Sequence, residues 1–335
     1  MSVDGALVGL DGVSRAFSVA GRQVWAVRDV SMEVGPGETF CVVGESGCGK
    51  TTTGRILAGL MRPTLGRVHF RGKDLWRLPR GEFAEFRRSV QIVHQNPYAS
   101  LNPLHTVERI LSAPLLRYHP ELGRQGARGR AAELLGLVGL TPPEEFLGKL
   151  PHQLSGGQRQ RISIARAMTV DPSVVVADEP VSMVDVSLRA GILRVLERLR
   201  DEVGVGFLFI THDLAVARYF GRRGRIGVMY LGRLVEVGPT EAVVSNPSHP
   251  YTRILLSAVA EPDPRGTRTQ QRIAPRSLDV PSLLRVPGGC AFHPRCPWYE
   301  PEVCDKRFPE LRQLEIGRKV ACHLVDERGE LPNNP

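Results

Sequence analysis

The eight residues from Gly44 to Thr51 read Gly-Glu-Ser-Gly-Cys-Gly-Lys-Thr and match the phosphate-binding pattern G-x-x-x-x-G-K-S/T. Glycines at these spacings let backbone N–H groups close around phosphate oxygens, and a helix beginning near Lys50 adds the positive end of its dipole. Lys50 is expected to reach the β- and γ-phosphates of a nucleotide, and the Thr51 hydroxyl to ligate Mg²⁺. A glycine-rich turn with a chance lysine explains eight matching residues poorly. The predicted binding loop comprises Gly44, Glu45, Ser46, Gly47, Cys48, Gly49, Lys50, Thr51 and Thr52.

Two consecutive carboxylates, Asp178 and Glu179, follow the apolar stretch Val174–Ala177. Sheets of α/β proteins place their ligands at the carboxyl ends of strands, which is where this pair stands. Asp178 is expected to hold Mg²⁺, directly or through water, and Glu179 to polarise an attacking water as a general base. An Asp-Glu pair that only caps a helix is common in isolation. Together with the phosphate loop, the pair favours a hydrolytic site.

The apolar pattern predicts the elements that position these groups. Thr39–Val43 is typical of a buried strand before the loop, and Thr51–Leu60 of a helix after it. Val174–Ala177 and Phe207–Ile210 are further apolar strands, separated by a helical pattern over Leu188–Glu202. This alternation predicts a parallel sheet covered by helices.

The chain of 335 residues is long enough for one large domain or two smaller ones. A turn-rich start near residue 95 and helical stretches around 106–117 and 127–139 indicate a helical insertion. From Pro262 the composition shifts to Pro and Arg with little periodicity, which indicates a linker and a small C-terminal region. We therefore expect a large domain over 1–260, with a helical subdomain at about 96–163, and a cysteine-containing region over 261–335.

Composition and charge exclude several classes of protein. Hydrophobic residues make up 42% and charged residues 24% of the chain, which are ordinary globular values. No apolar run approaches the ~18 residues of a membrane span, and the first ten residues lack the pattern of a secretory signal, so we expect a cytosolic location. The formal charge of +9 permits attraction to nucleic acid, anionic lipid or polyphosphate without selecting among them.

The sequence Leu154-Ser-Gly-Gly-Gln158 narrows the choice among phosphate-binding enzymes. Kinases, GTPases and helicases share the loop and the carboxylates, but at this point the chain resembles the ATP-binding subunits of ABC transporters, in which LSGGQ is the signature motif. The resemblance implies a RecA-like core with an antiparallel β subdomain and a helical signature subdomain, and hydrolysis of ATP to ADP and phosphate. It also implies a head-to-tail dimer in which each ATP contacts the partner's signature residues, here Ser155, Gly156, Gly157 and Gln158.

Gln95 and His212 match two further motifs of this family. Gln95 stands at the glutamine loop, whose side chain reaches Mg²⁺ and the attacking water and whose flank touches the membrane partner. His212 lies just past the strand Phe207–Ile210, where the family's switch histidine contacts the γ-phosphate and the catalytic glutamate. An isolated histidine would more often be a core or capping residue. The resemblance thus adds Gln95 and His212 to Glu179 as catalytic candidates.

Two further site residues match the family less closely: Phe17 has a competing candidate, and Asp185 ends a loop that departs from the family sequence. Phe17 is a candidate for stacking on adenine, although it could be an ordinary core aromatic and Trp25 competes for the role. Asp185, which serves the subunit interface in the family, ends the loop Ser182-Met-Val-Asp185, where Ser-Ala-Leu-Asp is usual. We expect a competent hydrolytic site with altered dimer contacts.

Two segments near the C-terminus resemble one importer branch of the family. Asn246-Pro-Ser-His-Pro-Tyr-Thr252 and Cys290-Ala-Phe-His-Pro-Arg-Cys296 are similar to the oligopeptide/dipeptide/nickel importer ATPases. This implies a second ATPase subunit, identical or homologous, two membrane-spanning permease subunits, an external solute-binding protein, and a place on the cytoplasmic face of the cell membrane. Peptides are the expected solutes, with oligosaccharides as the alternative. A rival, an ABC ATPase acting on nucleic acid or ribosomes, predicts a long coiled coil or two cassettes, whereas this chain has one cassette and no sustained heptads; we expect no nucleic-acid partner.

Four cysteines near the C-terminus are spaced C-x5-C-x7-C-x17-C: Cys290, Cys296, Cys304 and Cys322. In a reducing compartment such a group favours metal over disulfides. The count fits a 4Fe–4S cluster, and the resemblance implies the same because members of this branch carry one in this position. The spacing lacks the C-x2-C pairs of zinc ribbons, yet zinc and free thiols stay open as alternatives.

Overall fold

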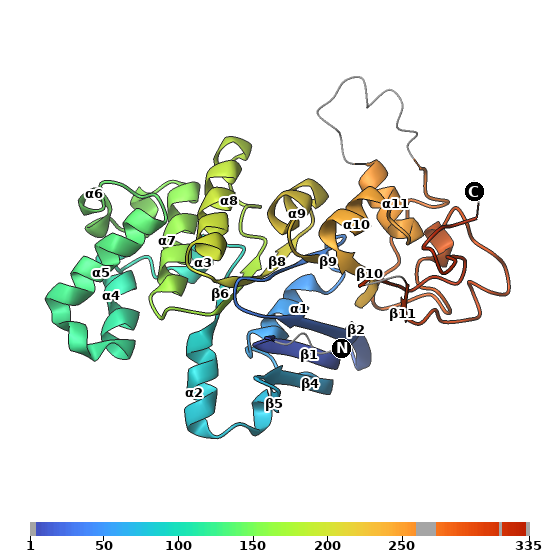
Figure 1. Cartoon of the computed structure of the whole chain (residues 1–335), viewed down its shortest axis with the longest axis horizontal. Helices are drawn as coiled ribbons and strands as arrows, with labels where there is room; N and C mark the ends of the chain where they lie inside the picture. Colours follow the sequence, from blue (N-terminus) through green and yellow to red (C-terminus); the bar gives the residue numbers. More distant parts are fainter. Residues whose placement is uncertain (1–4, 259–272, 315–316, 333–335) are drawn as a thin grey trace.

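The computed structural model describes residues 5–258, 273–314 and 317–332. Figure 1 shows an elongated molecule with a group of helices at one end, two sheets in the middle and an irregular C-terminal region at the other end. The predicted linker at the start of 261–335 lies largely outside the described residues.

The larger sheet positions the groups named above. Its order is β11-β12-β10-β9-β3-β8-β7-β6, and β9, β3, β8, β7 and β6 run parallel. Val43 pairs with Thr211, and Asp178 with Ile210, so these strands end at one edge. Every residue of β3, β7 and β8 is buried, as expected for strands covered on both faces. The strands are β3 (Thr39–Val43), β6 (Val90–Val93), β7 (Val174–Asp178), β8 (Gly206–Thr211), β9 (Arg225–Tyr230), β10 (Arg233–Pro239), β11 (Arg312–Gln313) and β12 (Lys319–Val320).

The smaller sheet is antiparallel, with the order β2-β1-β4-β5. Its strands are β1 (Val8–Val19), β2 (Arg22–Val34), β4 (Leu65–Phe70) and β5 (Lys73–Asp74). It shares one hydrophobic cluster with β3, β7 and β8, to which Val8, Phe40 and Ile210 all belong. The expected antiparallel β subdomain is thus packed directly on the parallel core.

Helices fill both sides of the larger sheet and form the end seen at the left of Figure 1. Side-chain caps fix several starts: the Thr106 hydroxyl accepts the Arg109 N–H before α4, and the Asp213 carboxylate accepts the Ala215 N–H before α9. The predicted helical subdomain of about 96–163 corresponds to α3 to α7, of which α7 continues to Met168. The helices are α1 (Lys50–Leu57), α2 (Arg80–Ser89), α3 (Pro97–Ser100), α4 (Val107–Tyr118), α5 (Gly123–Leu137), α6 (Glu144–Leu147), α7 (Gly156–Met168), α8 (Val186–Asp201), α9 (Leu214–Gly221), α10 (Thr240–Ser245) and α11 (Pro250–Ser257).

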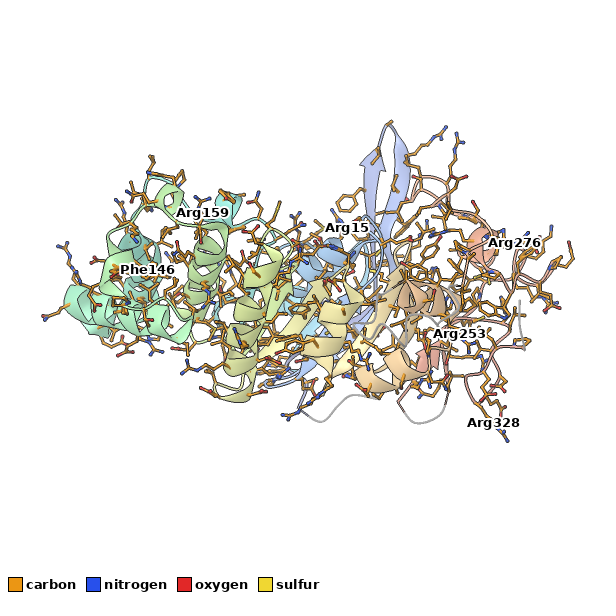
Figure 2. The ribbon with its side chains drawn as sticks, turned by 90° about the horizontal axis from the view of Figure 1, so that it is seen from above. Arg15, Phe146, Arg159, Arg253, Arg276 and Arg328 are labelled. Atoms are coloured by element: carbon orange, nitrogen blue, oxygen red, sulfur yellow. The ribbon has the colours of Figure 1, made fainter. Side chains whose placement is uncertain are left out.

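The C-terminal region joins the larger sheet instead of standing apart from it. β12 pairs with β10 through Glu236 and Val320, and β11 pairs with β12. These strands have two residues each, too short to leave a periodic pattern in the sequence. Figure 2 shows Arg253, Arg276 and Arg328 at this end of the molecule and Phe146 and Arg159 at the helical end. The division at residue 260 stays a prediction.

Within the described ranges, no helix combines the length and the apolar character that a membrane span requires.

Candidate nucleotide-binding site

A cavity of about 500 Å³ opens where the parallel strands end. The predicted loop, glutamine, glutamate and histidine all contribute to its wall, although they come from four separate segments. The residues that line it are Ala26, Ser46, Gly47, Gly49, Lys50, Thr51, Thr52, Gln95, Glu179, Ser182, Met183 and His212.

The phosphate loop between β3 and α1 requires glycine for conformational and steric reasons. Gly49 has φ 109°, and a Cβ there would lie 2.2 Å from the carbonyl oxygen of Ala26. A Cβ on Gly44 would lie equally close to the Met229 carbonyl, at 2.2 Å. The loop backbone is therefore pressed against β2 and β9, while Ser46, Gly47, Gly49 and Lys50 line the cavity.

Lys50 begins α1 and is buried, with 5% of its surface exposed. Its Nζ donates to the carbonyl oxygens of Gly44 at 2.8 Å and Glu45 at 3.0 Å. Two carbonyl acceptors hold the ammonium over the loop, where a phosphate oxygen would be a stronger acceptor than either. The loop and the lysine together suit a polyphosphate.

Thr51 and Asp178 meet across the sheet edge. The Thr51 hydroxyl donates to Asp178 Oδ1 at 3.0 Å. Burial raises the pKa of Asp178, and the Thr51 hydrogen bond opposes the rise. A hydroxyl beside a buried carboxylate is a hard-oxygen donor set, and a divalent cation there would favour the ionised carboxylate, so the pair fits Mg²⁺.

Glu179 is held between Gln95 and His212. Gln95 Nε2 donates to Glu179 Oε2 at 2.9 Å, and His212 Nδ1 lies 3.2 Å from Oε1. The Glu179 backbone has φ 46°, an uncommon conformation for a residue other than glycine, and its N–H donates to the Ile210 carbonyl at 2.9 Å. The turn after β7 thus directs the carboxylate into the cavity instead of along the strand.

Comparison with known proteins decides the family. Residues 27–182 match the family model described as ABC transporter, and residues 235–304 match that described as Oligopeptide/dipeptide transporter, C-terminal region. The oligopeptide transport ATP-binding protein OppF of Salmonella typhimurium is 44% identical over 301 residues, which cover 90% of this chain and 88% of that protein. The dipeptide transport ATP-binding protein DppF of Haemophilus influenzae is 42% identical over 314 residues, 94% of this chain and 93% of that protein. This chain belongs to the oligopeptide/dipeptide transporter family of ABC ATPases.

A solved structure supports the same fold. The ATP-binding cassette MJ0796, in a dimeric post-hydrolysis state bound to ADP and Pi, superposes with a TM-score of 0.63 at 31% identity, over 70% of this chain and 99% of that one. The predicted α/β ABC cassette fold and the predicted ATPase family are therefore confirmed.

The signature motif of this ABC ATPase lies outside the cavity. Ser155 caps α7: its hydroxyl accepts the Gln158 N–H at 3.2 Å, and the Gln158 side chain accepts the Ser155 N–H at 2.9 Å. A Cβ on Gly157 would lie 3.3 Å from Leu188, so the motif sits against the start of α8. None of the signature residues is among those that line the cavity. The cap uses the N–H groups of Ser155 and Gln158, and of the two glycines between them Gly157 is buried and Gly156 half-buried.

The aromatic candidates Phe17 and Trp25, and Asp185, are not among the residues that line the cavity. Phe17 is half-buried with the Arg15 guanidinium 4.9 Å from its ring, and neither it nor Trp25 lines the cavity, although Ala26 beside Trp25 does. Asp185 is exposed at the start of α8. The sequence analysis quoted Met183 only as a departure from the family loop, yet this exposed side chain lines the cavity.

Sequence reasoning missed the partners of Glu45. Its carboxylate binds Arg295, and its N–H donates to the Tyr251 hydroxyl. Both partners lie in the two segments that resemble the importer branch, Asn246–Thr252 and Cys290–Cys296. That resemblance was the one sequence signal that pointed to these residues. Nothing in the spacing indicates that they meet the phosphate loop.

The four C-terminal cysteines are neighbours. The Cys290 N–H donates to the Cys304 carbonyl at 2.8 Å. Burial raises the pKa of the Cys290 and Cys296 thiols to about 12, and repulsion from the other cysteines adds to the rise. In the described part of the chain, no group of three or more His, Cys, Asp or Glu side chains is arranged to hold a metal ion. The donor chemistry suits a soft metal, whereas the arrangement is not that of a preformed mononuclear site.

Proposed function

We propose that this chain is the ATP-hydrolysing subunit that energises import of oligopeptides or dipeptides. The observation that carries the proposal is the meeting of Lys50, Gln95, Glu179 and His212 around one cavity in a member of this ABC family. Relatives named as oligopeptide and dipeptide transport proteins support the solute class.

The side chains divide the work of ATP hydrolysis. Lys50 and the loop N–H groups bind the β- and γ-phosphates. Thr51 and Asp178 would hold Mg²⁺, which supplies charge neutralisation to the phosphates. Glu179 polarises the attacking water, Gln95 orients that water and the carboxylate, and His212 holds Glu179 from the other side at 3.2 Å. Phe17 stacks on adenine, with Trp25 as its competitor.

Two ATPase subunits, identical or homologous, act as a head-to-tail dimer. Ser155, Gly156, Gly157 and Gln158 present a capped helix start outside their own cavity, which suits a γ-phosphate bound by the partner. Asp185 borders that interface. Met183, with 55% of its surface exposed in the loop before Asp185, supports the expectation of altered dimer contacts.

The chain works on the cytoplasmic face of the membrane beside two permease subunits and, through them, an external solute-binding protein. The segment after Gln95 is a suitable contact, because Tyr98 and Leu104 are 61% and 84% exposed. The Arg159 guanidinium lies 4.1 Å from the Tyr98 ring, which links this surface to the signature helix. Nucleic acid has no role in this function.

Transport by the purified complex tests the proposal. Vesicles containing the ATPases and permeases, supplied with the binding protein, are expected to accumulate labelled peptides only with hydrolysable ATP. Lys50→Ala should abolish accumulation. Uptake of oligosaccharides instead of peptides would contradict the solute class, and co-purification with ribosomes or DNA but no permease would contradict the importer.

We propose further that Cys290, Cys296, Cys304 and Cys322 carry a 4Fe–4S cluster. The number and soft-donor chemistry of the four thiols support it, and their raised pKa values mean that binding must displace protons. Anaerobic purification with iron and zinc assays and an absorption spectrum tests the assignment. Stoichiometric zinc without iron would replace the cluster by a zinc site, and metal-free protein would leave free thiols.

A further inference from the structure

We propose that Glu45 is an anchor through which the C-terminal part of the chain positions the phosphate-binding loop, with Arg295 and Tyr251 as the positioning residues. The inference rests on the nucleotide assignment of that loop and adds to it a control from outside the ATPase motifs.

The Glu45 carboxylate forms a two-point ion pair with Arg295. Nη1 donates to Oε2 and Nη2 to Oε1, both at 2.9 Å. The arginine side chain is 8% exposed and the glutamate 26%. Bidentate pairing fixes orientation as well as distance, and burial protects the pair from screening by salt. Arg295 therefore sets the direction in which the second residue of the loop points.

Arg295 is itself held by the C-terminal region. It ends the short helical turn His293–Arg295, and its carbonyl accepts the Arg276 N–H at 3.1 Å. Its guanidinium lies 5.8 Å from the Phe292 ring centroid. Because Cys296 follows it directly and Cys290 stands five positions before it, whatever orders the cysteines also orders this arginine.

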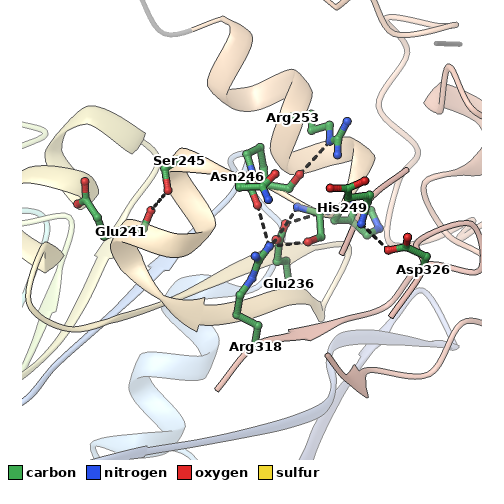
Figure 3. Close-up of polar contacts among 11 residues, drawn as sticks. Glu236, Glu241, Ser245, Asn246, His249, Arg253, Arg318 and Asp326 are labelled. Atoms are coloured by element: carbon green, nitrogen blue, oxygen red, sulfur yellow. Dashed lines mark hydrogen bonds and ion pairs between the residues drawn. The ribbon is translucent and has the colours of Figure 1, made fainter. Parts of the chain in front are cut away.

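Tyr251 holds the Glu45 backbone from a second direction. The Glu45 N–H donates to the Tyr251 hydroxyl at 3.0 Å. The Tyr251 ring is buried, with ring centroids 4.7 Å from Tyr230 and 5.3 Å from Phe292. Its helix, α11, begins where Glu236 accepts the Ser248 and His249 N–H groups at 2.8 and 3.0 Å. Figure 3 shows these backbone groups and Arg318 closing on the Glu236 carboxylate.

The anchor reaches the phosphate site directly. The Glu45 carbonyl accepts the Lys50 ammonium at 3.0 Å and the Cys48 N–H at 3.3 Å. A shift of Glu45 thus moves the lysine and a loop N–H together. Pairing with Arg295 also offsets a carboxylate that would otherwise repel phosphate oxygens nearby.

The C-terminal region borders the same loop at a second place. A hollow of about 270 Å³ is lined on one side by Glu45, Ser46, Gly47 and Cys48, and on the other by Val280, Pro281, Ser282 and Leu283. The C-terminal region therefore borders the loop directly, and two of the loop residues at this hollow, Ser46 and Gly47, also line the nucleotide cavity.

Nucleotide affinity of the full chain tests the anchor. The Kd for MgATP is measured by displacement of a fluorescent ATP analogue. The proteins compared are wild type, Arg295→Ala, Arg295→Lys, Tyr251→Phe and, as a matched control, Arg276→Ala. Arg276 lies in the same region, and Arg276→Ala removes only an exposed side chain, 4.4 Å from the Tyr299 ring, while it keeps the backbone N–H that donates to the Arg295 carbonyl. We expect Kd to rise roughly tenfold in Arg295→Ala and about threefold in Tyr251→Phe, with Arg276→Ala unchanged. Arg295→Lys should fall between wild type and Arg295→Ala, because it keeps the charge and loses the fork.

A double-mutant cycle separates positioning from general support of the fold. In Arg295→Ala the Glu45 carboxylate is left unpaired near the phosphates, so adding Glu45→Gln should recover part of the affinity. In the assembled transporter, Arg295→Ala should raise KM for ATP and leave kcat at saturating ATP within about twofold. A raised KM with a retained kcat is not expected of a partly unfolded enzyme.

Three results would overturn the anchor. The first is an unchanged Kd for MgATP in Arg295→Ala and Tyr251→Phe, and the second is a weaker affinity in the double variant Arg295→Ala/Glu45→Gln than in Arg295→Ala. The third is a Kd rise in Arg276→Ala as large as that in Arg295→Ala. Lys50→Ala is the reference. If it also leaves MgATP binding intact, the nucleotide assignment itself fails; if it abolishes binding while the anchor variants do not weaken it, only this inference fails.

Discussion

The catalytic edge of the sheet and the C-terminal region use polar side chains for opposite purposes. At the edge, backbone pairing of β3, β7 and β8 supplies the support, and Gln95, Glu179 and His212 add chemistry to a framework that stands without them. Where the C-terminal region meets the rest of the chain, its two-residue strands supply little, and Arg295 and Arg318, together with Glu236 of β10, hold segments together. Removing a polar side chain should therefore cost activity at the edge, whereas removing Glu236 should cost stability.

Glu179→Gln should give the largest effect, a loss of about 10³-fold in ATP hydrolysis by the assembled transporter, because an amide cannot accept the proton of the attacking water. Its midpoint of thermal unfolding should move by no more than about 2 °C. Steady-state phosphate release and calorimetry measure the two quantities. Glu202→Gln, at an exposed carboxylate that pairs with Arg198, is the matched control. Hydrolysis near the wild-type rate would disprove the assignment of the base.

Glu236→Ala should reverse that pattern and lower the free energy of unfolding by about 3 kcal/mol. The substitution leaves the Ser248 and His249 N–H groups without their acceptor, and Arg318 without its carboxylate. Urea unfolding followed by circular dichroism measures the change. Glu241→Ala, at an exposed position in the adjoining helix α10, should be near neutral. A loss below about 1 kcal/mol would mean that the C-terminal region is supported by other contacts.

The same contrast explains which features the sequence could predict. Lys50 and Glu179 follow buried strands whose apolar runs are visible in the sequence, and the bounds of Thr39–Val43 were predicted as they stand. Arg295 and Glu45 are 250 positions apart, and no periodicity or motif spacing in the sequence predicts their contact. The strands β11 and β12 are too short for a pattern, and the position of Phe17 outside the cavity depends on how the two sheets pack. Local motifs could be predicted from the sequence, whereas contacts made by single long side chains between distant segments could not.

His249 gives a smaller effect that depends on pH. Burial lowers its pKa from the ordinary 6.5 to about 3. Between those values the unfolded chain binds a proton that the folded chain does not, so the free energy of unfolding falls as the pH falls, by up to about 1.4 kcal/mol per unit. His249→Asn keeps an acceptor for the Tyr251 N–H and cannot titrate, so it should lose less stability than wild type from pH 6.5 to 5. Urea unfolding at each pH tests this, with exposed His152→Asn as control; parallel curves for wild type and His249→Asn would contradict it.

The smallest expected effect belongs to the Arg67–Asp11 pair of the antiparallel sheet. Its N–O distance is 2.9 Å, the same as in the Arg295–Glu45 pair, but its side chains are 62% and 55% exposed instead of 8% and 26%. Solvent screens an exposed pair, so a double-mutant cycle to alanine should give a coupling of less than about 1 kcal/mol that fades in 1 M salt. The coupling of Arg295 to Glu45 should persist at that salt concentration. Equal couplings for the two pairs would show that burial does not strengthen an ion pair in this protein, which would contradict the prediction.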